Sequence, residues 1–307
     1  MIYTPMSGIY TALVTPFHDD ERLDANGFGH LVDDQINAGI AGLVVNGSTG
    51  EFPSLTNEER RTSVEAVTQA SGGRAEVVVG VGAMTTREAQ GYAEHALAVG
   101  AKCGLLVMPY YEPLSTQELA RFVEDIASVG LPLMIYNNPG GTGMSLTPEF
   151  INELSFIENV VSIKDTTPEV SRLFAIDLLT EGRLDVLSGH DSSTIYAFLS
   201  GRDAAVWGAP NAHPAACVAL WRLAREGQAA EALRLWKDLY PLQAFLESHN
   251  YMASTKAGAN ARGVSVGQPR KPILPLPESE RSELAAVIER LDEVIETFDI
   301  APREDIA

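Results

Sequence analysis

The chain has 307 residues and a formal net charge of −19, with 45% hydrophobic and 21% charged residues. This balance is typical of a globular protein and argues against disorder. The acidic surplus argues against nucleic-acid and anionic membrane partners, because both require clustered cations. No stretch approaches the roughly 20 apolar residues of a membrane span, and residues 1–17 lack the Lys or Arg that opens a signal peptide. We therefore expect a cytoplasmic protein.

Short apolar runs alternate with longer amphipathic stretches along most of the chain. Val, Ile and Leu fill the short runs with little polar alternation, as in parallel strands that are buried on both faces. The predicted strands are residues 9–15, 42–46, 76–82, 104–108, 133–136, 160–164, 184–188 and 204–207. The predicted helices are residues 24–38, 56–70, 85–99, 116–128, 148–154, 169–179, 192–199 and 213–225.

Capping signals mark the start of several of these helices. Thr56 is followed three residues later by Glu59, and Thr85 by Glu88, which is the spacing of a capping box. Asp24 is the predicted cap of the first helix.

Eight consecutive strand–helix units of about 25–30 residues predict an α/β fold, the (β/α)₈ TIM barrel. A doubly wound dinucleotide-binding sheet is disfavoured, because Gly80 and Gly82 are followed by no third glycine at the required spacing. Beyond the eighth unit the pattern is helical, with a Pro-rich interruption between about residues 263 and 278. We expect a catalytic barrel domain at residues 1–227 and a C-terminal helical extension at residues 228–307.

One lysine stands out among the residues that end the predicted strands. The lysines are Lys102, Lys164, Lys237, Lys256 and Lys271. Only Lys164 ends a strand at the carboxyl side, where barrel enzymes place their active sites. A buried amine there can act as a Schiff-base nucleophile. The alternative is a structural lysine paired with Asp165 or another carboxylate, and its position alone does not separate the two.

The turn after the second strand is the candidate carboxylate site. It reads Gly47-Ser48-Thr49-Gly50-Glu51 and joins a strand to a helix, so two hydroxyls and successive backbone N–H groups can hold a carboxylate. The alternative is an ordinary turn in which Ser or Thr caps the helix. We expect Glu51 to serve packing or hydrogen bonding rather than catalysis.

Two further loops carry polar candidates. Tyr136 ends the fifth strand and could transfer protons, or be a core tyrosine with a satisfied hydroxyl. For His190 and Asp191 we favour loop hydrogen bonding over catalysis, because no third catalytic partner is evident. The six histidines and two cysteines show no metal-ligand spacing, so no metal site is expected.

Taken together, these segments form an ordered set of motifs. They are Gly8 with Thr15-Pro16-Phe17, Gly47-Ser48-Thr49-Gly50-Glu51, Pro109-Tyr110-Tyr111, Tyr136-Asn137-Asn138-Pro139 and Ile163-Lys164-Asp165. On these motifs the chain resembles the dihydrodipicolinate synthase/N-acetylneuraminate lyase family over about residues 8–268.

The resemblance implies a class I, Schiff-base mechanism with no metal or organic cofactor. By it, Lys164 attacks the keto carbon of pyruvate or of a longer 2-oxo acid. Ser48 and Thr49, in the turn that Gly47 opens, hold the substrate carboxylate. Tyr136 relays protons during imine formation and bond breaking.

The resemblance also implies an assembly. Tyr111 matches a tyrosine that the family contributes across a tight-dimer interface, and Gly189 and Val206 match positions that line the pocket. Members are commonly homotetramers built as dimers of dimers.

One departure bears on the substrate. The synthase branch places an arginine two residues after the proline of its Tyr-Asn-x-Pro motif, whereas this chain has Gly141. Without that guanidinium, aspartate semialdehyde loses its carboxylate anchor, so dihydrodipicolinate synthesis is disfavoured. We expect a Schiff-base lyase of the 2-keto-3-deoxy acid aldolase type. The alternatives are a 2-keto-3-deoxy acid dehydratase, a pyrroline-4-hydroxy-2-carboxylate deaminase or a non-catalytic metabolite-binding barrel.

Overall fold

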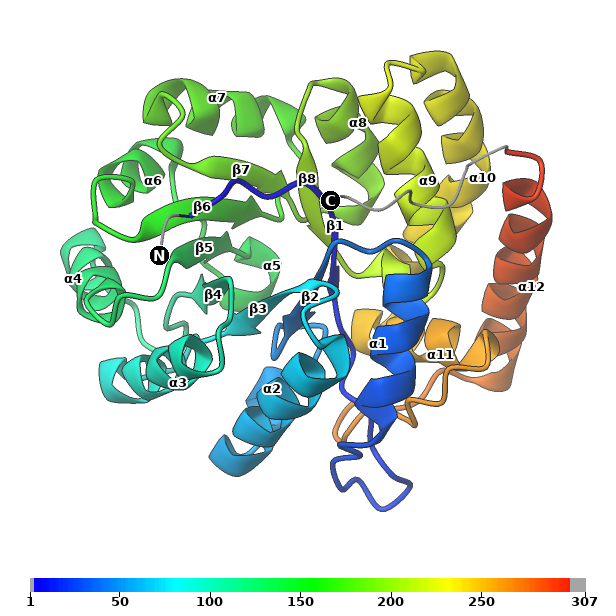
Figure 1. Ribbon diagram of the computed structural model, residues 1–307, viewed down its shortest axis with the longest axis horizontal. Helices are drawn as coiled ribbons and strands as arrows, with labels where there is room; N and C mark the ends of the chain where they lie inside the picture. The colour runs from blue at the N-terminus through cyan, green and yellow to red at the C-terminus, as the bar shows by residue number, and fades with distance from the viewer. Residues whose placement is uncertain (1–2, 299–307) are drawn as a thin grey trace.

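The computed structural model describes residues 3–298 and contains a closed barrel of eight parallel strands in chain order (Figure 1). The eighth strand pairs with the first, so the barrel has no open edge. The predicted TIM barrel is therefore confirmed. The strands are β1 (Gly8–Ala12), β2 (Gly42–Val45), β3 (Glu76–Gly80), β4 (Cys103–Val107), β5 (Leu133–Asn137), β6 (Val160–Asp165), β7 (Asp185–Ser188) and β8 (Ala204–Trp207).

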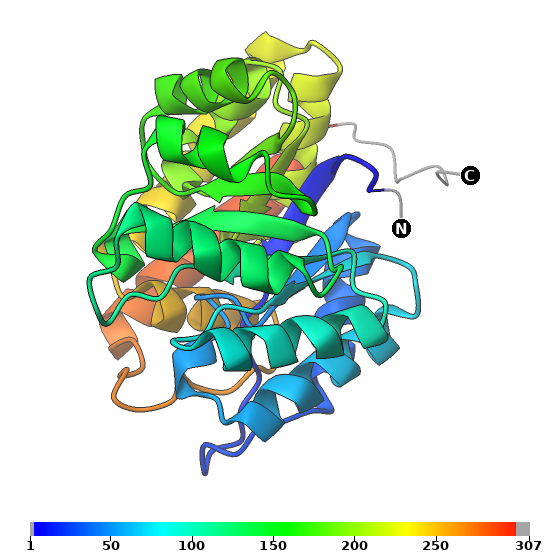
Figure 2. The same ribbon diagram turned by 90° about the vertical axis from the view of Figure 1, so that its left-hand side faces the viewer.

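A ring of helices covers the outside of the barrel, and Figure 2 shows α2, α3 and α4 lying side by side on it. The barrel helices are α1 (Gly27–Asn37), α2 (Asn57–Ser71), α3 (Thr86–Ala98), α4 (Thr116–Ala127), α6 (Pro148–Leu154), α7 (Val170–Thr180), α8 (Thr194–Leu199) and α9 (Pro214–Arg225). Short turns of helix also lie in the loops: α5 (Pro139–Thr142), η1 (Phe52–Ser54), η2 (Asp191–Ser193) and η3 (Ala209–Asn211).

The predicted caps at Thr56 and Thr85 are present, although the Glu88 carboxylate accepts from the Thr85 hydroxyl instead of completing a capping box. Asp24, in contrast, is not the cap of the first helix, whose N-cap position is Asn26. The side chain of Thr56 accepts from the Glu59 N–H, the Glu59 carboxylate accepts from the Thr56 N–H, and α2 begins directly afterwards. The first helix begins at Gly27, later than predicted. The Asp24 carboxylate nevertheless accepts a hydrogen bond from the Gly27 N–H at 3.0 Å, so Asp24 fixes the approach to the helix from outside it.

Residues on β6 alternate between the inside and the outside of the barrel, as the period of a strand requires. Ile163 packs in the outer core between strands and helices. Ser162 and Lys164 flank it and are both buried. They therefore point the other way, into the barrel, where Met134 and Tyr136 of β5 belong to the inner core. This alternation directs the Lys164 side chain inward.

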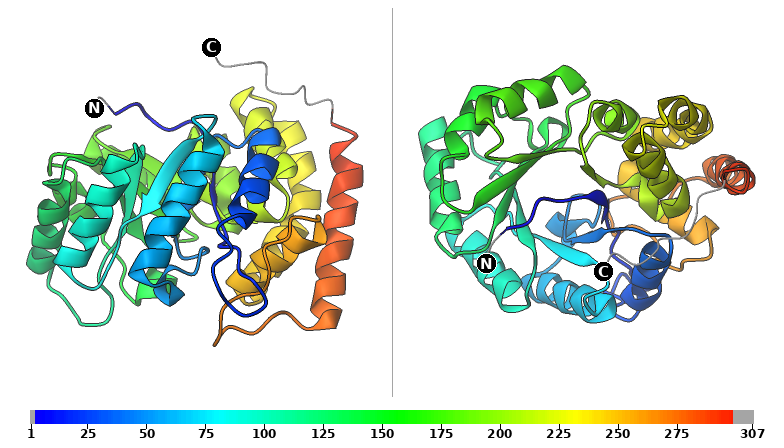
Figure 3. Two further views of the ribbon diagram at one scale, coloured as in Figure 1. Left: turned by 60° about the horizontal axis from the view of Figure 1, so that its bottom comes forward. Right: turned by 45° about the horizontal axis from the view of Figure 1, so that its top comes forward.

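The C-terminal extension consists of α10 (Ala229–Ser248), α11 (Tyr251–Ala261) and α12 (Glu278–Ile295). In Figure 3, α12 stands on the outside of the molecule, where it packs against α10 and α11. Residues 262–277 contain no helix, which confirms the predicted Pro-rich interruption. No helix within residues 3–298 is long and apolar enough to cross a membrane.

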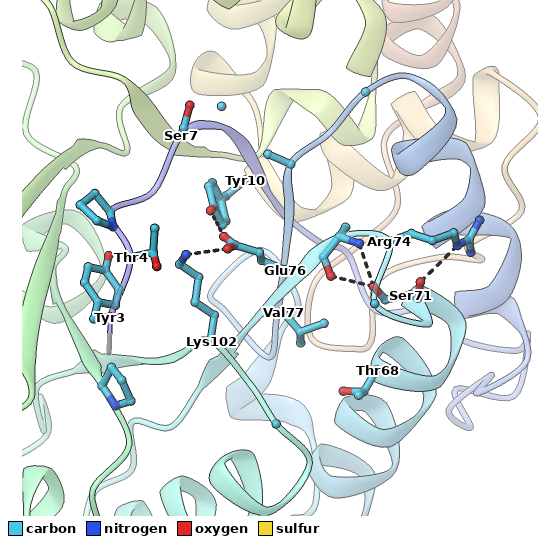
Figure 4. A pocket seen from close by; sticks show the side chains of 18 of the residues that line it. Tyr3, Thr4, Ser7, Tyr10, Thr68, Ser71, Arg74, Glu76, Val77 and Lys102 are labelled. Carbon is cyan, nitrogen blue, oxygen red and sulfur yellow. Dashed lines mark hydrogen bonds and ion pairs between the residues drawn. The ribbon is translucent and has the colours of Figure 1, made fainter. Parts of the chain in front are cut away.

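The amino-terminal end of the barrel holds a cavity of about 1110 Å³ with its own polar network (Figure 4). Glu76 accepts hydrogen bonds from the Tyr10 hydroxyl and from Lys102 Nζ, the latter at 2.6 Å. The Tyr3 hydroxyl donates to Asp185 at 2.9 Å. The Lys102 amine is therefore paired, at the opposite end of the barrel from Lys164.

Candidate active site

A pocket of about 590 Å³ lies at the carboxyl ends of the strands, where the sequence predicts the active site. Five predicted site residues line it: Ser48, Thr49, Tyr136, Lys164 and Gly189. They come from β2, β5, β6, β7 and the loops that follow these strands, so segments far apart in the sequence meet in one cavity.

Three other predicted residues do not line this pocket. Val206 is fully buried in the inner core of the barrel. Gly47 lies behind the carboxylate-site turn, where its carbonyl accepts from the Gly50 N–H at 3.1 Å. The Tyr111 side chain is 83% exposed, whereas its neighbour Tyr110 lines the pocket.

Lys164 and Tyr136 are lateral neighbours in the barrel wall. They are register partners on β6 and β5, and both side chains point inward. Lys164 Nζ lies 4.5 Å from the centroid of the Tyr136 ring. Strand pairing alone thus places an amine beside a phenol at the base of the pocket.

The carboxylate next to Lys164 in sequence is not its partner. Asp165 faces the outside of the barrel, where Oδ2 accepts from Arg172 Nε and Asn137 Nδ2, both at 2.9 Å. Its other oxygen accepts from Thr167. Within residues 3–298 no carboxylate forms an ion pair with Lys164. The alternative of a lysine paired with Asp165 or with another carboxylate is therefore not what the described residues show.

Gly189 makes room for the Lys164 side chain. A Cβ at Gly189 would lie 2.5 Å from Lys164 Cε and 2.8 Å from its Cγ, closer than carbon atoms can approach. The absence of a side chain at position 189 therefore sets the path that Lys164 takes into the pocket.

The turn at residues 47–52 presents free donors. Ser48 and Thr49 hold their N–H and hydroxyl groups without an acceptor in the described part of the chain, although both residues line the pocket. The turn is closed behind them, because the Glu51 N–H donates to the Ser48 carbonyl at 2.9 Å and the Thr15 hydroxyl to the Gly50 carbonyl at 2.7 Å. Such a cluster of unpaired donors is suited to a carboxylate.

Acidic and hydroxyl groups form the far side of the pocket. The buried Asp191 accepts a hydrogen bond from the Tyr251 hydroxyl. Glu247 accepts from the Ser192 N–H at 2.9 Å and lies 3.4 Å from His190 Nδ1. His190 thus faces Glu247 of α10, and within its own loop its carbonyl accepts a hydrogen bond from the Thr194 hydroxyl at 2.7 Å.

Burial raises the pKa values of both Asp191 and Tyr251. Burial raises the pKa of Asp191 to about 7, against the opposing effects of the Tyr251 hydroxyl and of Lys164. Burial and the neighbouring Asp191 likewise raise the pKa of Tyr251.

Sequence reasoning missed Glu247 and Tyr251, which belong to α10 and α11 of the extension. The strand–helix pattern of the barrel contains no signal for them, because their proximity to the pocket depends on how the extension folds back. In residues 3–298 no group of three or more His, Cys, Asp or Glu side chains is arranged to hold a metal ion.

Comparisons with known proteins identify the family of this chain. The model of the dihydrodipicolinate synthetase family matches residues 5–291. The chain belongs to this family. It is therefore an enzyme of the class I aldolase and lyase type.

Individual relatives align over nearly the whole chain. A 4-hydroxy-tetrahydrodipicolinate synthase of Parasynechococcus marenigrum is 36% identical and covers 94% of this chain and 96% of its own. The dihydrodipicolinate synthase of Acinetobacter baumannii in complex with pyruvate superimposes with a TM-score of 0.89 at 30% identity, covering 93% and 99%. A prophage protein of the dihydrodipicolinic acid synthase family from E. coli K12, also with pyruvate, gives 0.88 at 30% identity, covering 93% and 98%.

The steric effect of Gly189 on the position of the Lys164 side chain can be tested by substitution. We expect Gly189→Ala to displace the Lys164 side chain and to slow reaction of its amine with pyruvate by about 10²-fold, since a misplacement of about 1 Å has that effect. The measurement is the rate of borohydride-trapped adduct formation. The matched control is Gly140→Ala in the same pocket, where a Cβ meets nothing within 4 Å. Equal rates in the two variants would contradict the assignment.

The raised pKa of Asp191 predicts a pH dependence of stability. The unfolded carboxyl loses its proton near pH 4 and the folded one near pH 7, so the folded state binds this proton more tightly. Raising the pH through this window therefore lowers the free energy of unfolding, by up to about 1.4 kcal/mol per pH unit. We expect Asp191→Asn to gain about 2–4 kcal/mol relative to the native protein between pH 4 and pH 7.

Urea unfolding at several pH values measures this difference. The control is Asp19→Asn, which alters an exposed carboxylate and should run parallel to the native protein. A relative loss of stability in Asp191→Asn as the pH rises would show that the sign is wrong.

Proposed function

We propose that the enzyme cleaves the C3–C4 bond of a 2-keto-3-deoxy sugar acid and releases pyruvate, through an imine on Lys164. The observation that carries this proposal is the amine of Lys164, which has no carboxylate partner among the described residues and lies beside Tyr136. The free donors of Ser48 and Thr49 in the same pocket support it.

Imine formation uses three groups of the pocket. The donors of Ser48 and Thr49 hold the C1 carboxylate, and Lys164 Nζ, as the free amine, adds to the C2 carbonyl carbon. The hydroxyl of the resulting carbinolamine takes up a proton from the Tyr136 phenol and leaves as water. Within residues 3–298 the Tyr136 hydroxyl has no hydrogen-bond partner.

Cleavage follows from the imine as an electron sink. Tyr136, now a phenolate, takes the proton of the C4 hydroxyl, the C3–C4 bond breaks, and its electron pair forms an enamine. The aldehyde leaves, and the enamine accepts at C3 the proton that the Tyr136 phenol has taken from the C4 hydroxyl. Water then hydrolyses the imine, which frees pyruvate and the Lys164 amine.

The charges of the pocket support a hydroxylated substrate over a dicarboxylic one. Among the residues that the structure describes, Lys164 is the only Lys or Arg that lines the cavity. Gly141, at the position of the synthase arginine, lines it without a side chain. A distal carboxylate would meet Asp191 and Glu247 with no cation to pair with, whereas hydroxyl groups can donate to both.

The assembly remains part of the proposal. The enzyme is proposed to be a cytoplasmic homotetramer, as the resemblance implies, and Tyr111 is exposed and therefore free to reach the pocket of a neighbouring subunit.

The imine is tested by borohydride reduction in the presence of pyruvate, followed by mass spectrometry. We expect an adduct on Lys164, none in Lys164→Ala, and an unchanged adduct in the control Lys102→Ala at the opposite end of the barrel. Tyr136→Phe should lower turnover by about 10²–10⁴-fold, the usual range for loss of a proton-transfer group, and still form the adduct slowly. Equal, mild losses in Lys164→Ala and Tyr136→Phe would reject these roles.

The reaction type is tested by screening 2-keto-3-deoxy sugar acids, the hydroxyproline-derived pyrroline and aspartate semialdehyde with pyruvate. Lactate dehydrogenase and NADH report released pyruvate. We expect pyruvate from a sugar acid and no condensation of aspartate semialdehyde. Consumption of a substrate without pyruvate would instead indicate elimination of water or ammonia from the same imine, and rapid condensation would indicate synthase activity.

A further inference from the structure

A buried ion pair joins the C-terminal extension to the turn that carries Ser48 and Thr49. Lys256 of α11 is 1% exposed and Glu51 is 2% exposed. Lys256 Nζ lies 2.9 Å from Glu51 Oε1 and donates a hydrogen bond to the Gln268 carbonyl at 3.0 Å. An amine from the extension thus contacts a residue two positions beyond Thr49.

The extension also holds the second oxygen of the same carboxylate. The Arg270 N–H donates to Glu51 Oε2 at 2.8 Å. The Arg270 guanidinium donates to the Ser54 carbonyl at 2.6 Å and pairs with Glu59, the capping residue of α2. Both Glu51 oxygens and the far end of the turn are therefore attached to residues 256–270.

The backbone of Glu51 shows why this attachment matters. Glu51 has φ 57° and ψ 34°, the left-handed conformation that a residue with a side chain adopts only when its surroundings impose it. In this conformation its N–H closes the turn onto the Ser48 carbonyl at 2.9 Å. The direction of the free donors at Ser48 and Thr49 depends on this closure.

Stability alone explains this pair poorly. Taking an ammonium and a carboxylate out of water costs about as much as their attraction returns, and apolar replacements are often as stable. Burial in fact lowers the pKa of Lys256 to about 8, despite the neighbouring Glu51. The ion pair is better explained by a role in fixing the geometry of the turn than by a contribution to the stability of the protein.

We propose that Lys256 and Glu51 are positioning residues, whose ion pair holds residues 47–52 so that the donors of Ser48 and Thr49 face the carboxylate of the 2-oxo acid. This proposal rests on the proposed function of that turn. Neither residue lines the pocket, so both act through Ser48 and Thr49.

The test compares two carbonyl probes that differ in the carboxylate. Pyruvate and hydroxyacetone are each trapped on Lys164 with borohydride, and their half-saturating concentrations are measured in the full-length enzyme. We expect Lys256→Met, which removes the charge and keeps the chain length, to weaken pyruvate by about tenfold or more, since small misplacements have large effects. Hydroxyacetone should change by less than about twofold, because it does not use the carboxylate donors. A purely structural defect would weaken both probes alike.

Two further variants make the result decisive. Lys271→Met removes an exposed lysine of the same segment, which pairs with Glu21 at 3.3 Å, and should leave both probes unchanged. Glu51→Gln keeps the shape and an acceptor for the Arg270 N–H, and should weaken pyruvate selectively in the same way. If Lys256→Met does not fold, judged by circular dichroism, Glu51→Gln decides alone.

An unchanged ratio of pyruvate to hydroxyacetone in the folded variants overturns the positioning role. A native enzyme that traps no pyruvate on Lys164 overturns the proposed function itself, so the two failures are distinguishable.

Discussion

The amine of Lys164, which has no carboxylate partner among residues 3–298, is the feature around which the rest of this site is arranged. Lys164 is buried in a barrel wall, yet the acid beside it in sequence is turned outward and is satisfied by Arg172, Asn137 and Thr167. Lysines are rarely buried without a partner, so the surrounding structure must hold Lys164 there. Three features hold the Lys164 side chain in place: the pairing of β6 with β5, the inward-facing position of residue 164 on β6, and the absence of a side chain at Gly189.

The same barrel treats another lysine in the opposite way. Lys102 at the amino-terminal end lies 2.6 Å from Glu76, within a network that includes Tyr10. One end of the strands therefore neutralises its amine, and the other leaves its amine available for reaction. This division agrees with the general pattern of TIM barrels, in which the amino-terminal face serves stability and the carboxyl-terminal face serves catalysis.

The sequence was sufficient for the barrel but not for the whole pocket. Eight repeated units of similar length leave few alternative folds. A polar residue at the carboxyl end of a strand has a known place in a barrel, so Lys164, Tyr136 and the turn at Ser48 could be located from the sequence. Tyr251 and Glu247 could not, because their approach depends on tertiary packing of α10 and α11. Gly189 was predicted as a lining residue, whereas its steric relation to Lys164 required coordinates.

The extension therefore contributes to the site in two separate ways. Through Tyr251 and Glu247 it supplies the far wall of the pocket, and through Lys256 it is attached to the turn at the near wall. A substrate that spans the cavity from the Ser48 turn to Asp191 would contact groups whose positions are both set by α11. Changes in α11 thus alter the two ends of the pocket together, while the position of Lys164 between them is set by the pairing of β5 with β6 and by Gly189.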